Sequence, residues 1–205
     1  MTLVDTAAAT RVLLIIDAVD RVDPHSVSDL DLSRLAYFVD AFSPLWGLTP
    51  LDRYRIKGPE PRSQSVRRAV TRLVATGVVV PSDVTIAAGP TPHLSARYRL
   101  DRSLGAPILH AVHATRRGRQ EVSLVDEIVF ATATMLNGLL DLAVRHDAGF
   151  DDPRIGPSDV IDLASSSEGT TAAAQRFLRG VASRTHVEAE LTHLYMAHLE
   201  RSIGR

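Results

Sequence analysis

One stretch, Ser63 to Val80, limits the fold most, because it joins an amphipathic helix to an apolar strand through a single glycine. Its apolar side chains recur every three or four residues, which marks one buried helix face. They are Val66, Ala69, Val70, Leu73 and Val74. The opposite face is polar and rich in arginine. Gly77 stands where a helix end favours a left-handed residue, and the valines after it predict a strand.

Two helices are predicted before this stretch and a β-ribbon after it. The first helix is expected to begin at Thr10, a capping residue, after a weakly patterned lead-in, and the second at Asp31 or Ser33. Beyond Pro81, two β-rich segments flank a Gly/Pro turn at residues 89–92. This order is typical of a winged helix-turn-helix, and we expect residues 1–102 to form one.

Residues 103–205 are expected to form a helical domain for packing and partner binding. A helix is predicted from Ser103 to Ala114, ending at the basic run 116–119. Residues 121–144 are apolar nearly all round, which predicts one long central helix buried by its neighbours. A short helix capped by Ser158 and one or two helices within 169–203 follow. The whole chain is therefore expected to be mainly α with a small β-wing.

Four polar residues interrupt the predicted central helix: Asp126, Glu127, Asn137 and Asp141. A buried carboxylate is costly unless it is paired. We expect these residues to meet arginines of other helices, with Arg145 as a local partner for Asp141 at i+4.

Residues 51–75 contain seven cationic and two anionic residues, although the whole chain carries a net charge of -1. Such a neutral protein does not coat nucleic acid by bulk charge, so any contact must be local. A winged helix touches phosphates and groove edges through its third helix and its wing. The candidate DNA-binding residues are Arg53, Arg55, Lys57, Arg62, Arg67, Arg68, Arg72, Arg97 and Arg99. An arginine face of this kind also suits a solvated helix or a protein-binding surface.

The sequence predicts no enzyme and no cofactor. It has no cysteine, which excludes disulfides and thiolate zinc sites, and it lacks the phosphate loop, GxSxG and HExxH motifs. His186, Glu190 and His193 share a helix face at metal-ligand spacing, but we expect a solvated or interfacial face there. Neither a signal peptide nor a membrane anchor is indicated, which favours the cytoplasm.

Four segments together resemble the middle component of bacterial ABC-three-component defence systems, a group that includes the small subunit of Lamassu-type anti-phage systems. They are RVLLIIDAVDRV, LSRLAYFVDAF, GLTPLDRYRIKG and SQSVRRAVTRLVATGVVV. The similarity covers the first half of the chain and is a pattern of hydrophobic and turn positions. It implies a small non-catalytic winged-helix subunit that binds an ATPase related to SMC and Rad50 proteins, in a complex whose separate effector is often a nuclease.

We therefore expect an accessory subunit that binds such an ATPase, with double-stranded DNA as a further partner and no membrane. The residues are equally compatible with a dimeric winged-helix transcription regulator, in which the C-terminal helices form the dimer and the third helix enters the major groove. A metal-dependent enzyme that uses the face of His186 is the third and weakest alternative.

Overall fold

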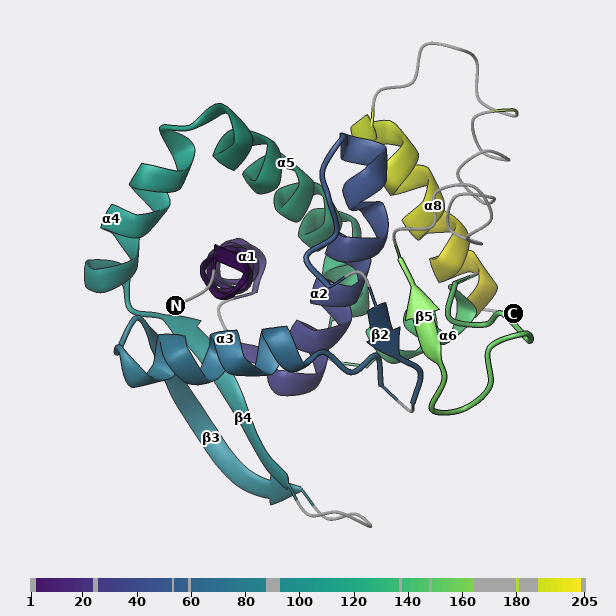
Figure 1. The fold of residues 1–205 in the computed structure, drawn as a ribbon, viewed down its shortest axis with the longest axis horizontal. Coiled ribbons are helices and arrows are strands. Elements are labelled where there is room, and N and C mark those ends of the chain that lie inside the picture. Colours follow the sequence, from purple (N-terminus) through teal and green to yellow (C-terminus); the bar gives the residue numbers. More distant parts are fainter. Residues whose placement is uncertain are drawn as a thin grey trace.

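The computed structural model describes residues 3–23, 26–52, 54–58, 60–87, 93–136, 138–147, 149–163, 180 and 188–203. Within these residues the fold is mainly helical with a small three-stranded antiparallel sheet, which confirms the predicted class. Figure 1 shows helix α1 (Leu3–Val22) end-on, with other helices around it. They are α2 (Asp29–Phe42), α3 (Gln64–Ala75), α4 (Arg102–His113) and α5 (Arg116–Ala131).

Helix α1 is buried around its whole circumference. Residues 11–19 are all buried, and the side chains from Val12 to Ile16 are at most 3% exposed. The helix begins well before Thr10, so the predicted cap and lead-in are wrong. The Thr10 hydroxyl instead donates to the Thr6 carbonyl at 3.0 Å from inside the helix. Alanines at 7–9 favour this early start, because alanine is the strongest helix former.

Arg11 of α1 is a charged residue buried in this core, with 3% of its surface exposed. Its Nη1 donates to Asp40 Oδ1 of α2 at 2.5 Å. Its Nε and Nη2 donate to the Glu121 carboxylate of α5 at 2.6–3.0 Å. Asp40 Oδ1 also accepts from the Leu51 backbone N–H at 2.9 Å. One guanidinium therefore ties α1 to a helix from each half of the chain.

The three-stranded sheet has the order β1-β4-β3 and is antiparallel throughout. Its strands are β1 (Val27–Ser28), β3 (Val79–Ala87) and β4 (His93–Leu100). Strand β1 is too short to give a periodic signal, and the sequence did not predict it. The hairpin of β3 and β4 confirms the predicted ribbon, whereas the predicted turn at residues 89–92 lies outside the described residues.

Helix α3 matches its prediction at both ends. The Ser63 hydroxyl caps it by accepting from the Val66 N–H at 3.0 Å. Gly77 follows the last turn with φ +73°, a left-handed conformation that favours glycine. The chain then enters β3, so helix, glycine and strand follow one another as expected.

The predicted long central helix is wrong, because α5 ends at Ala131 and the chain turns. The Thr132 hydroxyl donates back to the carbonyls of Ile128 and Val129, at 2.8 and 3.3 Å, and such bonds compete with helix continuation. The basic run 116–119 opens α5 instead of following α4, because Thr115 caps α5 through the Gly118 N–H. The remaining short helices are η1 (Ser43–Trp46), η2 (Ala133–Met135) and α6 (Leu140–His146).

The predicted helix after Ser158 is a strand, β5 (Val160–Asp162), which pairs antiparallel with β2 (Tyr54–Ile56). Ser158 has φ +74°, and its N–H donates to the Lys57 carbonyl at 2.8 Å, so it forms a turn into the strand. Pairing with a distant segment therefore overrides the local capping signal. The final helix is α8 (Glu188–Ile203).

Ion pairs between helices account for the carboxylates of α5 and α6. Asp126 pairs with Arg21 of α1 at 2.5 Å, and Asp141 pairs with Arg145 at 3.1 Å, as expected. Glu127 instead lies 2.6 Å from Nε2 of a histidine, His193 of α8. The buried apolar residues of both halves form one continuous cluster.

Replacing Arg11 by methionine, which keeps much of the apolar stem, should lower the free energy of unfolding by about 3–5 kcal/mol, because Asp40 and Glu121 stay buried without their cation. Urea unfolding at pH 7 measures this change. Arg145→Ala is the matched control, since that pair lies at the surface and should cost less than about 1 kcal/mol. Equal effects of the two substitutions would show that the buried network does not hold the helices together.

Candidate nucleic-acid interface

Helix α3 divides into an inner apolar face and an outer arginine face. Val66, Ala69, Val70 and Leu73 are buried. The opposite side is exposed and consists of Gln64, Arg67, Arg68, Thr71 and Arg72. We call this side the α3 arginine face. It contains no carboxylate, so its positive charge is not neutralised along the helix itself.

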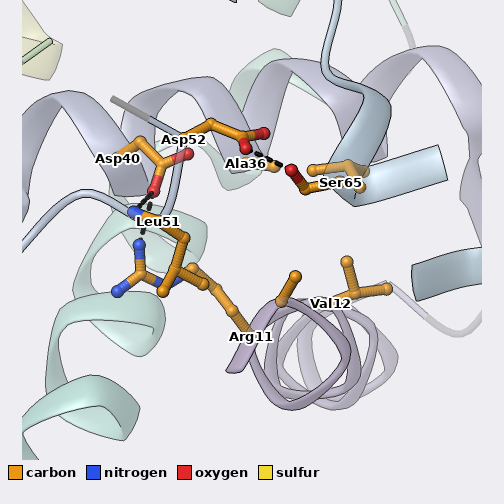
Figure 2. Close-up of a pocket in the computed structure, with 9 residues that line it drawn as sticks. Arg11, Val12, Ala36, Asp40, Leu51, Asp52 and Ser65 are labelled. Atoms are coloured by element: carbon orange, nitrogen blue, oxygen red, sulfur yellow. Dashed lines mark hydrogen bonds and ion pairs between the residues drawn. The ribbon is translucent and has the colours of Figure 1, made fainter. Parts of the chain in front are cut away.

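Hydrogen bonds beneath the N-terminus of α3 fix the position of this face. The Asp52 carboxylate accepts from the hydroxyls of Ser63 and Ser65. Figure 2 shows Asp52 and Ser65 at one side of a small pocket, with Asp40 and Arg11 at the other. Because these polar groups are hydrogen-bonded or ion-paired to one another, the pocket belongs to the support of α3 and offers little to a substrate.

The two anions of residues 51–75 are both engaged by partners. Asp52 is held by the two serines, and Glu60 accepts from Nε and Nη2 of Arg34 in α2 at 3.0 and 2.6 Å. Arg34 also donates to Asp31 at 3.0 Å. Glu60 is thereby tied to α2, whereas Asp52 is tied to the serines at the N-terminus of α3.

The structure separates the nine candidate DNA-binding residues. Exposed side chains belong to Arg62, Arg67, Arg68, Arg72 and Arg99. Arg53 lies outside the described residues, and for Arg55 the structure describes only the backbone, within β2. Arg62, Arg67, Arg68 and Arg72 lie in or just before α3, so the exposed charge is concentrated on one short segment.

Lys57 and Arg97 are engaged inside the protein. The Lys57 ammonium donates to the carbonyls of Asp152 and Ile155, at 3.1 and 2.9 Å. Arg97 of β4 donates to the hydroxyl and the carbonyl of Ser26, at 3.2 and 2.5 Å. Both residues support loops, and neither could leave its partners for a phosphate without loosening them.

The outer strand of the hairpin is apolar where a phosphate contact would need charge. Val84 is 57% exposed and Ile86 is 73% exposed. The only charged residue of β3 is the acidic Asp83, which has φ +48°. Strand β3 therefore adds no cation to the α3 arginine face.

No cluster of three or more potential metal ligands occurs among the residues that the structure describes. His186 lies outside them. His193 is engaged with Glu127 of α5, as described above, and Glu190 is exposed on α8. His110 and His113 are exposed on α4.

Sequence reasoning missed Asp147, a carboxylate that is fully buried just after α6. It accepts from the hydroxyls of Tyr37 and Tyr195, at 2.6 and 2.5 Å, and from the Gly149 N–H at 3.0 Å. Burial raises its pKa above the ordinary value of 3.8. With no exposed surface it cannot meet a substrate, so it joins α2 and α8 to the end of α6. No sequence signal pairs these three residues.

No helix in the described ranges has the length and apolar character needed to cross a bilayer. No protein-family model matches the sequence, and no curated protein is significantly similar to it.

The raised pKa of Asp147 predicts a pH dependence of stability. A raised pKa means that the folded state holds the proton more tightly, so this stabilisation is present below pH 3.8 and is lost as pH rises through the folded-state pKa. The difference in unfolding free energy between wild type and Asp147→Asn, measured in urea from pH 4 to 8, should therefore fall with pH. A difference that rises with pH would mean that the tyrosine hydrogen bonds outweigh burial.

Proposed function

We propose that this protein is a non-catalytic winged-helix accessory subunit that binds a larger ATPase of the SMC and Rad50 class in bacterial anti-phage defence, and that it acts in the cytoplasm. The order α1-β1-α2-η1-β2-α3-β3-β4, in which β2 pairs outside this sheet, and the sheet order β1-β4-β3 support a winged helix. The resemblance of the first half of the chain supports the ATPase partner and a separate effector nuclease.

The α3 arginine face is the observation that carries a role in DNA contact. Arg67, Arg68 and Arg72 are exposed on one side of a helix whose other side packs into the core. Arg62 lies just before the helix and is also exposed. Four cations on this short segment suit phosphate contacts, which position a protein on a duplex without reading its sequence.

The chemistry of the hairpin favours backbone contact over sequence-specific reading. Arg97 is occupied by Ser26, and the outer strand presents Val84 and Ile86. A dimeric transcription regulator, the alternative, would need its wing and third helix to contact one operator together. We therefore propose that any DNA contact by this chain is weak, strongly dependent on salt, and made within the larger complex.

The first prediction from this proposal concerns the complex. Co-expression with the genes that flank it should yield a complex with a large ATPase at fixed stoichiometry, measured by size-exclusion chromatography with light scattering. The ATPase alone should hydrolyse ATP, and this chain alone should not. A stable symmetric dimer that binds a single operator, with no ATPase recovered, would instead support the transcription regulator.

The second prediction concerns the α3 arginine face. Replacing Arg67, Arg68 and Arg72 by alanine should weaken binding to random-sequence duplex DNA and should reduce the slope of log K against log salt by about 3, one unit for each lost phosphate contact. Fluorescence anisotropy of a labelled duplex from 50 to 200 mM salt, the range over which such contacts are lost, measures both changes.

The matched control removes the same charge from other helices. It replaces Arg116, Arg117 and Arg201, which are exposed on α5 and α8. If the control weakens DNA binding as much as the α3 variant, binding depends on total charge, and the α3 arginine face is not the DNA surface.

A further inference from the structure

Helix α4 carries apolar side chains that the described part of the chain covers only in part. Leu104 is 47% exposed, Ile108 is 37% exposed, and Pro107 and Ala111 are exposed beside them. Spacings of three and four residues place these side chains on one side of the helix. We call Leu104, Pro107, Ile108 and Ala111 the α4 strip. Figure 1 places α4 at the outer edge of the molecule, with one side toward α1.

The helix is held by contacts on its other sides. Gly105 is its only buried residue, and a Cβ there would lie 2.4 Å from Leu100 Cδ1, so helix and sheet approach too closely for a side chain. Asp101 caps the helix through the N–H groups of residues 103 and 104. Arg102 pairs with Asp17 of α1 at 2.5 Å. Helix α4 is therefore held firmly in place, while the α4 strip keeps a substantial exposed apolar surface.

The surroundings of the strip are basic. No Asp or Glu occurs from Arg102 to Gln120. Arg119 donates to the carbonyls of His113 and Ala114 at the end of α4, at 3.0 and 3.4 Å. Arg116 and Arg117 are exposed at the start of α5, next to that end. An occupant of the strip would therefore meet cations at the C-terminal end of α4 and would gain from carrying acidic residues there.

We infer that the α4 strip docks an amphipathic helix of a partner protein, with apolar residues on the strip and acidic residues facing Arg116 and Arg117. The small side chains Ala111 and Pro107 favour this occupant, because they let a second helix approach closely. This inference rests on the proposed function in one respect, since it assigns the helix to the ATPase partner.

Three other occupants fit the strip less well. Duplex DNA offers a charged backbone and would bury little of Leu104 or Ile108. A membrane surface favours large aromatic and aliphatic residues, and α4 has no aromatic residue. A second copy of this chain would bring two acid-free helices together, so the cations of one copy would meet no carboxylate on the α4 of the other.

The test compares two variants of α4 within the complex. Leu104→Ser with Ile108→Ser should lower the affinity for the purified neighbouring ATPase by a factor on the order of ten or more, because an apolar anchor is lost. The control Ala106→Ser with His110→Ser changes the other exposed side of the same helix and should leave affinity unchanged. Thermal unfolding of both variants checks that they fold. Binding of the ATPase to both variants with wild-type affinity would overturn the inference and leave the proposed function standing.

A second measurement keeps the inference testable if the ATPase does not bind wild-type protein, in which case the proposed function fails. The probe is a labelled amphipathic helical peptide with leucine on one side and glutamate beside it, compared with the same peptide carrying lysine. Wild-type protein should bind the glutamate peptide more tightly, and Leu104→Ser with Ile108→Ser should remove that binding. The inference would be overturned if the protein bound both peptides equally or bound neither. It would also be overturned if wild-type protein co-sedimented with anionic lipid vesicles, or formed a dimer, and the strip variant lost that behaviour.

Discussion

The fold depends on α1 being buried on every side, and Arg11 sets the geometry of that burial. A helix that packs around its whole circumference has no polar face to orient it, so a directional contact must define its rotation. The Arg11 guanidinium provides that contact, because its fork fits the carboxylates of Asp40 and Glu121 together. The Leu51 N–H on Asp40 then places the segment that leads to α3. The position of the α3 arginine face follows from a charge buried in α1.

Local pattern predicted the elements that carry strong local signals. Helix α3 has a clear apolar period and Gly77 at its end, and both hold in the structure. The prediction failed where a distant partner decides the outcome. Strand β5 forms because β2 is available to pair with it, and residues 121–144 divide because Thr132 bonds back to the helix. The pairing with β2 is not visible within a short window of sequence, whereas the Thr132 bonds are local and were outweighed in the prediction by the apolar pattern around them.

The candidate site was predictable as a charge cluster but not as a surface. The sequence shows where cations cluster along the chain. It does not show that Lys57 binds two carbonyls or that Arg97 binds Ser26. Those contacts depend on loops that are brought close only in the folded protein. Asp147 shows the same limit, because its tyrosine partners come from α2 and α8. Composition fixes how many charges there are, and tertiary contacts decide which of them face the solvent.

Runs of sequence without acidic residues contain the exposed arginines of α3 and of the start of α5. Arg11 and Arg21 each meet a carboxylate from another helix and Arg34 meets Glu60 of the segment before α3, so their charges serve the fold. No Asp or Glu occurs from Pro61 to Ser82 or from Arg102 to Gln120, and these two runs contain the α3 arginine face and the surroundings of the α4 strip. Leu104 joins the two surfaces, since a Cβ on Gly77 at the end of α3 would lie 3.5 Å from its Cδ1. A partner helix on the strip would therefore have one end beside the end of α3, while its acidic residues would face Arg116 and Arg117 at the opposite end of α4. The partner and DNA would then use different cations of the same molecule.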